Sequence, residues 1–336
     1  MQSFGNIVVY HPAAIGDCML ATPVATTLKL NYPAAQLTYW THSSLRPILL
    51  ELCPAVDEVV DYVRDASLFQ HMKTFEQLRP DLFIDLSNTL KSSAFTWMTK
   101  IKVLRYEKQA PHVRPIKHAT ANFLDTIKPV CNEYPEHLFP TIFPDALAID
   151  VVHRVISEQG FGPQPLIGIV PGVGKLRPHR AWIYDGWKYL LQHILGWQSH
   201  LPVLIGGAEE QALCAELNAE LDGRCLNLAG RLSLTETAAF LKKCKVVISG
   251  DTGPAHIAVA VGTRVIGLYG PTYPARSGPY GCASTTLDQS ASCQCQDQKS
   301  CKYTAPGTPG ECMHRIQLSE IIAQMKAELE AQETLN

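Results

Sequence analysis

Short apolar runs of about four or five residues recur along the chain, and segments with helical spacing separate most of them. Continuous runs of Val, Ile and Leu are typical of strands that are buried on both faces, as in parallel sheets. When helices alternate with such strands, the pattern favours βαβ units. The sequence therefore predicts strands at residues 7–10, 37–40, 82–85, 103–104, 166–170, 203–206, 225–228, 246–248 and 265–268.

The chain passes through this pattern twice, with a proline-rich segment at 133–145 between the two series of strands. A length of 336 residues also exceeds what one hydrophobic core usually holds. Ligands of doubly wound sheets bind beyond the carboxyl ends of the strands, so two such domains would place a site in the cleft that they face. The final helix could return to pack on the first domain. We predict an α/β protein with two doubly wound domains, at residues 1–155 and 156–336.

Composition and charge restrict the class of protein. Hydrophobic residues make up 46% and charged residues 18%, which is typical of globular domains. The formal net charge is −2, and no block of Lys or Arg stands out, which argues against nucleic acid as the main partner. No apolar run reaches the roughly 18–20 residues that span a bilayer, and the first residues lack the pattern of a signal peptide. We expect a cytoplasmic protein, with peripheral contact to the inner face of the cytoplasmic membrane left open.

The first predicted strand runs into the turn His-Pro-Ala-Ala-Ile-Gly-Asp, which ends at Asp17. Gly16 allows the backbone to turn closely, and Asp17 opens a helical segment. An acid at this place can cap the helix. It can equally be a carboxylate at the edge of a cleft, available as a general base. The residues alone leave both interpretations open.

Two glycine-containing turns follow the first two strands of the second series. Residues 171–182 combine Gly172 with several cations, among them Arg180. Such a loop could hold a diphosphate through backbone amides and Arg, or it could be an ordinary solvated basic loop. It is not a Walker A loop, which needs Gly-Lys-Ser/Thr. In the turn at 206–210, Glu209 could bond ribose hydroxyls, or it could favour the first turn of a helix through the helix dipole.

The most distinctive turn is Gly-Asp-Thr-Gly-Pro-Ala-His, between the strand at 246–248 and a helical run. Asp251, Thr252 and Gly253 occupy the turn, and the proline suits the first helical position. The N-terminus of a helix presents free amides and binds anions such as phosphate. A lone histidine is usually structural, but His256 stands beside the expected anion, which favours a functional role.

These motifs resemble those of a known family. The stretch from Gly250 to Thr272 resembles the signature of glycosyltransferase family 9, the lipopolysaccharide heptosyltransferases and their relatives. Ile-Gly-Asp, with Ala-Thr-Pro at 21–23, is similar to the first motif of that family. Residues 86–92 resemble its acceptor-side loop, and residues 228–236 also fit. The resemblance covers nearly the whole chain, in the order of the family.

The resemblance implies a GT-B fold, in which two Rossmann-like domains bind the substrates between them. It implies an enzyme that moves a sugar, typically heptose from ADP-heptose, onto a glycan or a growing lipopolysaccharide core. Transfer would invert the anomeric centre without a metal or other cofactor, with Asp17 as the base. The acceptor would bind near Gly16 and Lys91. The residues that would hold the donor are Gly172, Arg180, Glu209, Asp251, Thr252, Gly253 and His256.

Two departures from the family pattern point to a divergent relative. His-Pro-Ala-Ala replaces the usual lead into Ile-Gly-Asp, and the loop from Lys175 to Arg180 looks longer. A sugar-nucleotide epimerase and a non-catalytic nucleotide-sugar-binding protein of the same fold remain alternatives. An NAD dehydrogenase is weaker, because no Gly-x-Gly-x-x-Gly follows the first strand.

Four of the 11 cysteines gather in a polar segment near the C-terminus. Cys-x-Cys replaces the Cys-x2-Cys spacing of a standard zinc pair. A zinc site, free thiols and local disulfides therefore all remain open for Cys293, Cys295, Cys301 and Cys312.

Overall fold

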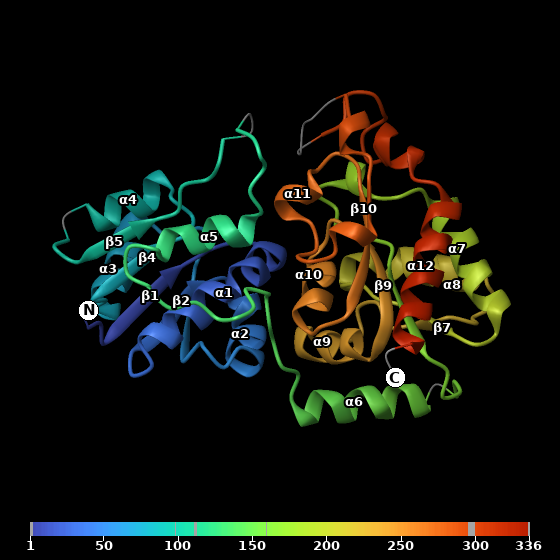
Figure 1. Cartoon of the computed structure of the whole chain (residues 1–336), viewed down its shortest axis with the longest axis horizontal. Helices are drawn as coiled ribbons and strands as arrows, with labels where there is room; N and C mark the ends of the chain where they lie inside the picture. The colour runs from blue at the N-terminus through green and yellow to red at the C-terminus, as the bar shows by residue number, and fades with distance from the viewer. Residues whose placement is uncertain (1–2, 98, 111–112, 159, 295–299, 335–336) are drawn as a thin grey trace. The chain divides into compact units, whose positions relative to one another are not determined.

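The computed structural model contains one five-stranded and one six-stranded sheet, each with helices packed on it (Figure 1). It describes residues 3–97, 99–110, 113–158, 160–294 and 300–334. The chain divides into two units, Met1–Phe143 (unit 1) and Pro144–Asn336 (unit 2). All strand pairs in the described ranges are parallel, which confirms the predicted α/β class with two doubly wound domains.

The sheet of unit 1 has the strand order β3-β2-β1-β4-β5. Its direction of growth reverses between β1 and β4, so the loops that follow these two strands are neighbours at the switch point. The strands are β1 Asn6–Tyr10, β2 Gln36–Thr41, β3 Glu58–Asp61, β4 Leu82–Asp85 and β5 Lys102–Arg105. The helices are α1 Ile15–Asn31, α2 Arg46–Leu52, α3 Leu68–Leu78, α4 Leu90–Thr96 and α5 Ala119–Ile127.

The sheet of unit 2 has the order β11-β10-β9-β6-β7-β8, and its switch point lies between β6 and β9. The strands are β6 Leu166–Val170, β7 Leu201–Leu204, β8 Leu226–Asn227, β9 Cys244–Gly250, β10 Arg264–Tyr269 and β11 Thr286–Asp288. The helices are α6 Ala146–Glu158, α7 Tyr184–Trp197, α8 Gln211–Ala219, α9 Leu234–Lys243, α10 Gly253–Ala260, α11 Pro274–Ser277 and α12 Leu318–Glu333.

Helix α1 continues through Pro23, although proline cannot donate a hydrogen bond to the carbonyl four residues earlier. That carbonyl, on Met19, accepts a hydrogen bond of 2.8 Å from the Thr22 hydroxyl instead. The buried carbonyl is thereby satisfied, so the helix runs unbroken from its first turn, which carries Asp17, into the core.

The first and last helices of unit 2 both pack within that unit. Helix α6 packs on α9 and so belongs to unit 2, whereas the sequence placed the boundary near the end of that helix. Helix α12 buries Ile321 and Met325 in the core of the same unit, against α7, β9 and β10. An amphipathic pattern shows that a helix has a buried face, but not which sheet covers it. No helix of the described ranges has both the length and the apolar character to cross a bilayer.

Candidate functional site

In unit 2, the side chain of Glu210 joins the loops that follow β6 and β7. Its two carboxylate oxygens accept hydrogen bonds from the amides of Gly174, at 3.1 Å, and Gly207, at 2.8 Å. A Cβ added to Gly172 would lie only 2.1 Å from Glu210 Cγ, so the loop can approach this closely only with glycine. The sequence pattern allows Glu210 only a place in the first turn of a helix, and it did not predict that this side chain joins the two loops.

Glu209, which the sequence offers as a ribose ligand, accepts a hydrogen bond of 3.2 Å from the amide of Lys175. Both adjacent acids therefore hold backbone amides of the loop after β6. This role is structural, but it differs from the helix-dipole role that the sequence also allows. A ribose contact of Glu209 stays a prediction.

The loops after β6 and β9 meet through the ion pair of Arg180 and Asp251. Arg180 ends the 3-10 turn η2 (Pro178–Arg180), and its Nη1 lies 2.6 Å from Asp251 Oδ2. Each side chain is only 12% exposed. A charge-assisted hydrogen bond in such a poorly solvated place is strong and directional. Asp251 thus fixes the position of the Arg180 guanidinium at the switch point of unit 2.

Helix α10 begins beside this ion pair, and its first turn is not capped by a side chain. Thr252 is the N-cap residue, but its hydroxyl pairs with Ser249 Oγ at 2.8 Å instead of with a first-turn amide. Gly253 is the first helical residue, so the following Pro254 is the second and not the first, as the sequence predicts. His256 is buried in the same turn. Amides at an uncapped helix start can bind an anion.

Tyr269, at the carboxyl end of β10, has a buried hydroxyl that lies close to Asp251. Burial raises the pKa of Tyr269 well above its ordinary value, and the charge of nearby Asp251 raises it further. The phenol therefore keeps its proton at neutral pH. The sequence analysis did not single out this residue. A tyrosine at the carboxyl end of a buried parallel strand could nevertheless have indicated a side chain near the site.

In unit 1, the carboxylate of Asp17 lies exposed on the first turn of α1. The helix begins after Ala14, which is the N-cap residue, so Gly16 is its second residue and Asp17 its third. The interpretation of Asp17 as the N-cap is therefore wrong. Within the described ranges, its carboxylate takes part in no hydrogen bond or ion pair, which leaves its oxygens available to a substrate.

His11 is a buried imidazole in the loop between β1 and α1, edge-on to Phe123 at 5.1 Å between ring centroids. Burial lowers the pKa of His11 to about 4, and the charges of Asp17 and Asp85 offset only part of this effect. Its Nδ1 has no partner in the part of the chain that the structure describes. A neutral histidine thus stands close to the candidate base, and the sequence had not assigned it.

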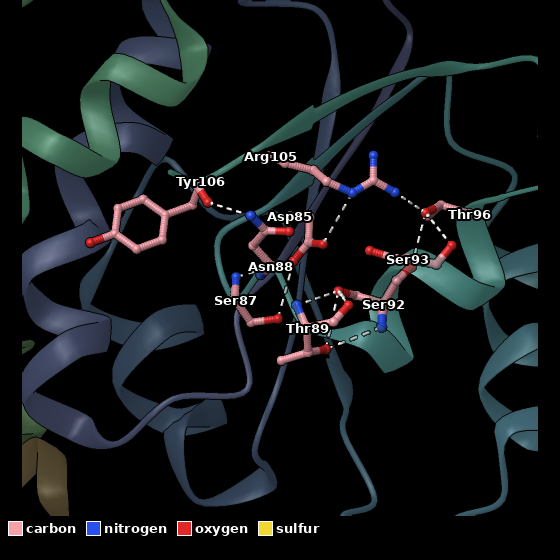
Figure 2. Close-up of polar contacts among 9 residues, drawn as sticks. All are labelled: Asp85, Ser87, Asn88, Thr89, Ser92, Ser93, Thr96, Arg105 and Tyr106. Carbon is pink, nitrogen blue, oxygen red and sulfur yellow. Dashed lines mark hydrogen bonds and ion pairs between the residues drawn. The ribbon is translucent and has the colours of Figure 1, made fainter. Parts of the chain in front are cut away.

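The loop after β4 is held by Asp85, which is fully buried at the end of that strand (Figure 2). One carboxylate oxygen accepts from the amide and hydroxyl of Ser87, both at 3.1 Å, and from the amide of Asn88 at 2.8 Å. Its other oxygen lies 3.9 Å from Nε of Arg105 on β5. These contacts fix the start of the loop that the resemblance places on the acceptor side, and the sequence had not singled out Asp85.

Lys91, on α4, is directed at the segment that precedes α3. Its Nζ donates to the carbonyl of Ala66 at 3.1 Å and lies 3.5 Å from that of Arg64. It also lies 5.6 Å from the centre of the Tyr62 ring. These contacts give Lys91 a structural role in joining two segments, and its acceptor role stays a prediction.

The family assignment rests on a sequence comparison. The model of glycosyltransferase family 9 (heptosyltransferase) matches residues 68–305, which is more than half of the chain. The chain belongs to glycosyltransferase family 9. The enzyme class predicted from the motifs is thereby confirmed: the protein is a glycosyltransferase of the heptosyltransferase family.

Individual relatives agree with this assignment. The lipooligosaccharide heptosyltransferase 2 of Haemophilus influenzae is 25% identical over 307 residues, covering 84% of this chain and 88% of that protein. The family 9 glycosyltransferase of Veillonella parvula has a TM-score of 0.80 at 17% identity, over 98% and 99% of the two chains. The E. coli ADP-heptose lipopolysaccharide heptosyltransferase II has a TM-score of 0.75 at 20% identity, with the same coverage. These structural likenesses confirm the GT-B fold.

Three of the four clustered cysteines of this glycosyltransferase lie near one another in unit 2, and Cys295 lies outside the described residues. Burial raises the pKa of Cys312 to about 12, and neighbouring Cys293 and Cys301 raise it as well. No group of three His, Cys, Asp or Glu side chains in the described ranges could hold a metal ion. The zinc interpretation stays a prediction.

The buried His11 should make stability depend on pH. Its folded pKa of about 4 lies below the value near 6.5 of an unfolded histidine, so only the unfolded chain takes up the proton between these values. Stability should therefore be full above pH 6.5 and fall as the pH drops toward 4. We expect His11 to account for about 2 kcal/mol of lost unfolding free energy between pH 7 and 5.

Urea unfolding at these two pH values checks this expectation. His11→Gln should lose less stability on acidification than the wild type, whereas the exposed His153→Gln should behave like the wild type. Equal acid sensitivity of His11→Gln and the wild type would contradict the neutral, buried state of His11.

Proposed function

We propose that this glycosyltransferase moves heptose from ADP-heptose onto a lipopolysaccharide-core acceptor, with inversion and without a metal. The observation that carries the proposal is the Arg180–Asp251 pair beside the uncapped start of α10, in a family 9 chain. The donor and acceptor are suggested by the relatives, since the E. coli enzyme is named for ADP-heptose and the Haemophilus enzyme for lipooligosaccharide.

The donor contacts of the proposal come from unit 2. The diphosphate would lie on the first-turn amides of α10, beside His256, and accept hydrogen bonds from Arg180. Asp251 would hold the guanidinium in place, because the two side chains are paired at 2.6 Å. As the bond from C1 to the diphosphate breaks, these fixed donors would stabilise the negative charge that develops on the leaving ADP.

The base of the proposal comes from unit 1. The Asp17 carboxylate would accept the proton of an acceptor hydroxyl while that oxygen bonds to C1 of the heptose. Attack on the face opposite the leaving diphosphate inverts the anomeric centre. The exposed, unpaired carboxylate supports this role, since it is free to meet a substrate. The neutral His11 nearby adds no positive charge that would hold Asp17 in a permanent ion pair.

Asp17→Asn should lower the rate of transfer by about 10²–10⁴, the usual cost of losing a general base. The amide has almost the same shape but cannot take up the proton. Turnover with an ADP-heptose donor and a core-oligosaccharide acceptor measures the effect, and calorimetry should show nearly normal ADP binding. Asp65→Asn, which alters another exposed acid of unit 1, serves as the control. If the Asp17→Asn variant turned over as fast as the wild type, Asp17 would not be the general base.

Transfer should continue after exhaustive treatment with EDTA, because Arg180 and the α10 amides would stabilise the leaving group. The rate of ADP release before and after chelation tests this. Recovery of a lost activity by Mg²⁺ or Mn²⁺ would overturn the metal-independent mechanism. A loss that only Zn²⁺ restores, together with unfolding on chelation, would instead indicate a structural metal at the cysteine segment.

Arg180→Ala should weaken ADP binding about tenfold to a hundredfold, because a charged hydrogen bond typically contributes about 1.5–3 kcal/mol. The loss should be smaller for AMP, which lacks the second phosphate. Asp251→Asn should also favour AMP over ADP relative to the wild type, since Arg180 loses its partner. Lys242→Ala, an exposed change at the end of α9, is the control. Equal weakening for both nucleotides in calorimetry would mean that Arg180 contacts the base or ribose.

A further inference from the structure

Helix α4 of unit 1 buries Phe95 in the core but leaves other apolar side chains exposed to solvent. Leu90 is 92% exposed and Trp97, which directly follows the helix with helical backbone angles, is 84% exposed. Ala94 is also exposed. The spacing i, i+4, i+7 places these three residues on one side, which we name the α4 face. Two hydroxyl residues, Ser92 and Thr96, are buried on the other side.

Hydrogen bonds hold α4 in this orientation (Figure 2). Ser92 Oγ donates to the carbonyl of Thr89 at 2.9 Å, and the Thr89 hydroxyl accepts from the Ser92 amide at 3.1 Å. The Thr96 hydroxyl donates to the carbonyl of Ser92 at 2.8 Å and accepts from the guanidinium of Arg105. Rotating the apolar residues inward would leave these buried polar groups without partners, which is costly. The exposure of the α4 face is therefore fixed by the structure.

The chain segment that begins at α4 is strongly basic. Residues 91–117 contain seven Lys or Arg and one acid, Glu107, whereas the whole chain has a net charge of −2. The expectation that no block of cations stands out is therefore wrong. Arg105 and Lys117 have carboxylate partners in Asp85 and Asp125. This basic segment runs from α4 through β5, which is the edge strand of the sheet, into the connection before α5.

More exposed apolar side chains lie at the start of helix α3, which packs on α4. Phe69 is 75% exposed, and Leu68 before it is also exposed. Lys91 ties the two helices together here, since its Nζ donates to the carbonyl of Ala66, just before α3. Exposed apolar side chains thus lie on both of these packed helices.

We propose that the α4 face is a docking surface for an anionic lipid bilayer. Leu90 and Trp97 would enter the interface, where tryptophan is particularly favourable, and lysines of the basic segment would bind acidic headgroups. Clustered cations beside exposed apolar side chains are the combination that such a surface recognises. Nucleic acid would use the cations but would leave the exposed Leu90 and Ala94 without a function. Docking through the α4 face would bring the enzyme to a lipid bilayer whichever sugar it transfers.

Sedimentation of the protein with lipid vesicles tests the proposal. The wild type should bind vesicles of phosphatidylcholine mixed with phosphatidylglycerol, bind pure phosphatidylcholine far less, and be released by salt. The double variant Leu90→Ser/Trp97→Ser should bind the anionic vesicles about tenfold more weakly or worse, because two apolar side chains no longer leave water. Lys100→Glu/Lys102→Glu should lose most of the preference for anionic lipid.

Matched controls separate docking from general surface effects. Leu147→Ser removes an equally apolar side chain on α6, 75% exposed, and should bind like the wild type. Lys242→Glu/Lys243→Glu reverses two exposed charges at the end of α9 and should also bind like the wild type. Thermal unfolding confirms that each variant is folded. Unchanged vesicle binding by folded Leu90→Ser/Trp97→Ser, or no binding by the wild type, would overturn the proposal. The vesicles contain no sugar acceptor, so either result leaves the proposed transfer reaction untouched.

Discussion

The candidate donor site depends on the ion pair between Arg180 and Asp251. It joins two loops that come from different strands and that meet only because the sheet of unit 2 reverses its growth between β6 and β9. On one side of the pair, Glu210 ties the loop after β6 to the loop after β7. On the other side, α10 begins with uncapped amides. A single poorly solvated contact thus sets where a cation and a helix start lie relative to each other.

The repeated apolar runs were enough to predict the fold class, because strands buried in a parallel sheet need continuous apolar sequence. Nine strands were found in this way, with small differences at their ends. The edge strands β3 and β11 were missed. Glu58–Asp61 contains acids at both ends and Thr286–Asp288 is only three residues long, since an edge strand is covered on fewer sides and carries a weaker pattern.

The candidate site could be predicted where a motif marks a turn, as at Asp17 and at Asp251. It could not be predicted where a role depends on a partner far along the chain. Glu210 is one of two adjacent acids, and only its contact with Gly172 reveals which of them braces the loop. His11 is an ordinary histidine in the sequence, and its buried, neutral state arises from neighbours such as Phe123. In the sequence, Asp85 is only the polar last residue of an apolar strand, which does not predict that it holds the following loop.

The close approach of Gly172 to Glu210 has a consequence for how such a site can change over generations. The Glu210 Cγ methylene occupies the space that a side chain at position 172 would need. The two positions therefore share one small volume, and neither can be altered alone without either a collision or a gap. A variant with a larger residue at position 172 would become viable only after a shorter one had arisen at position 210. The order of substitutions, and not only their sum, would then limit the routes open to this loop.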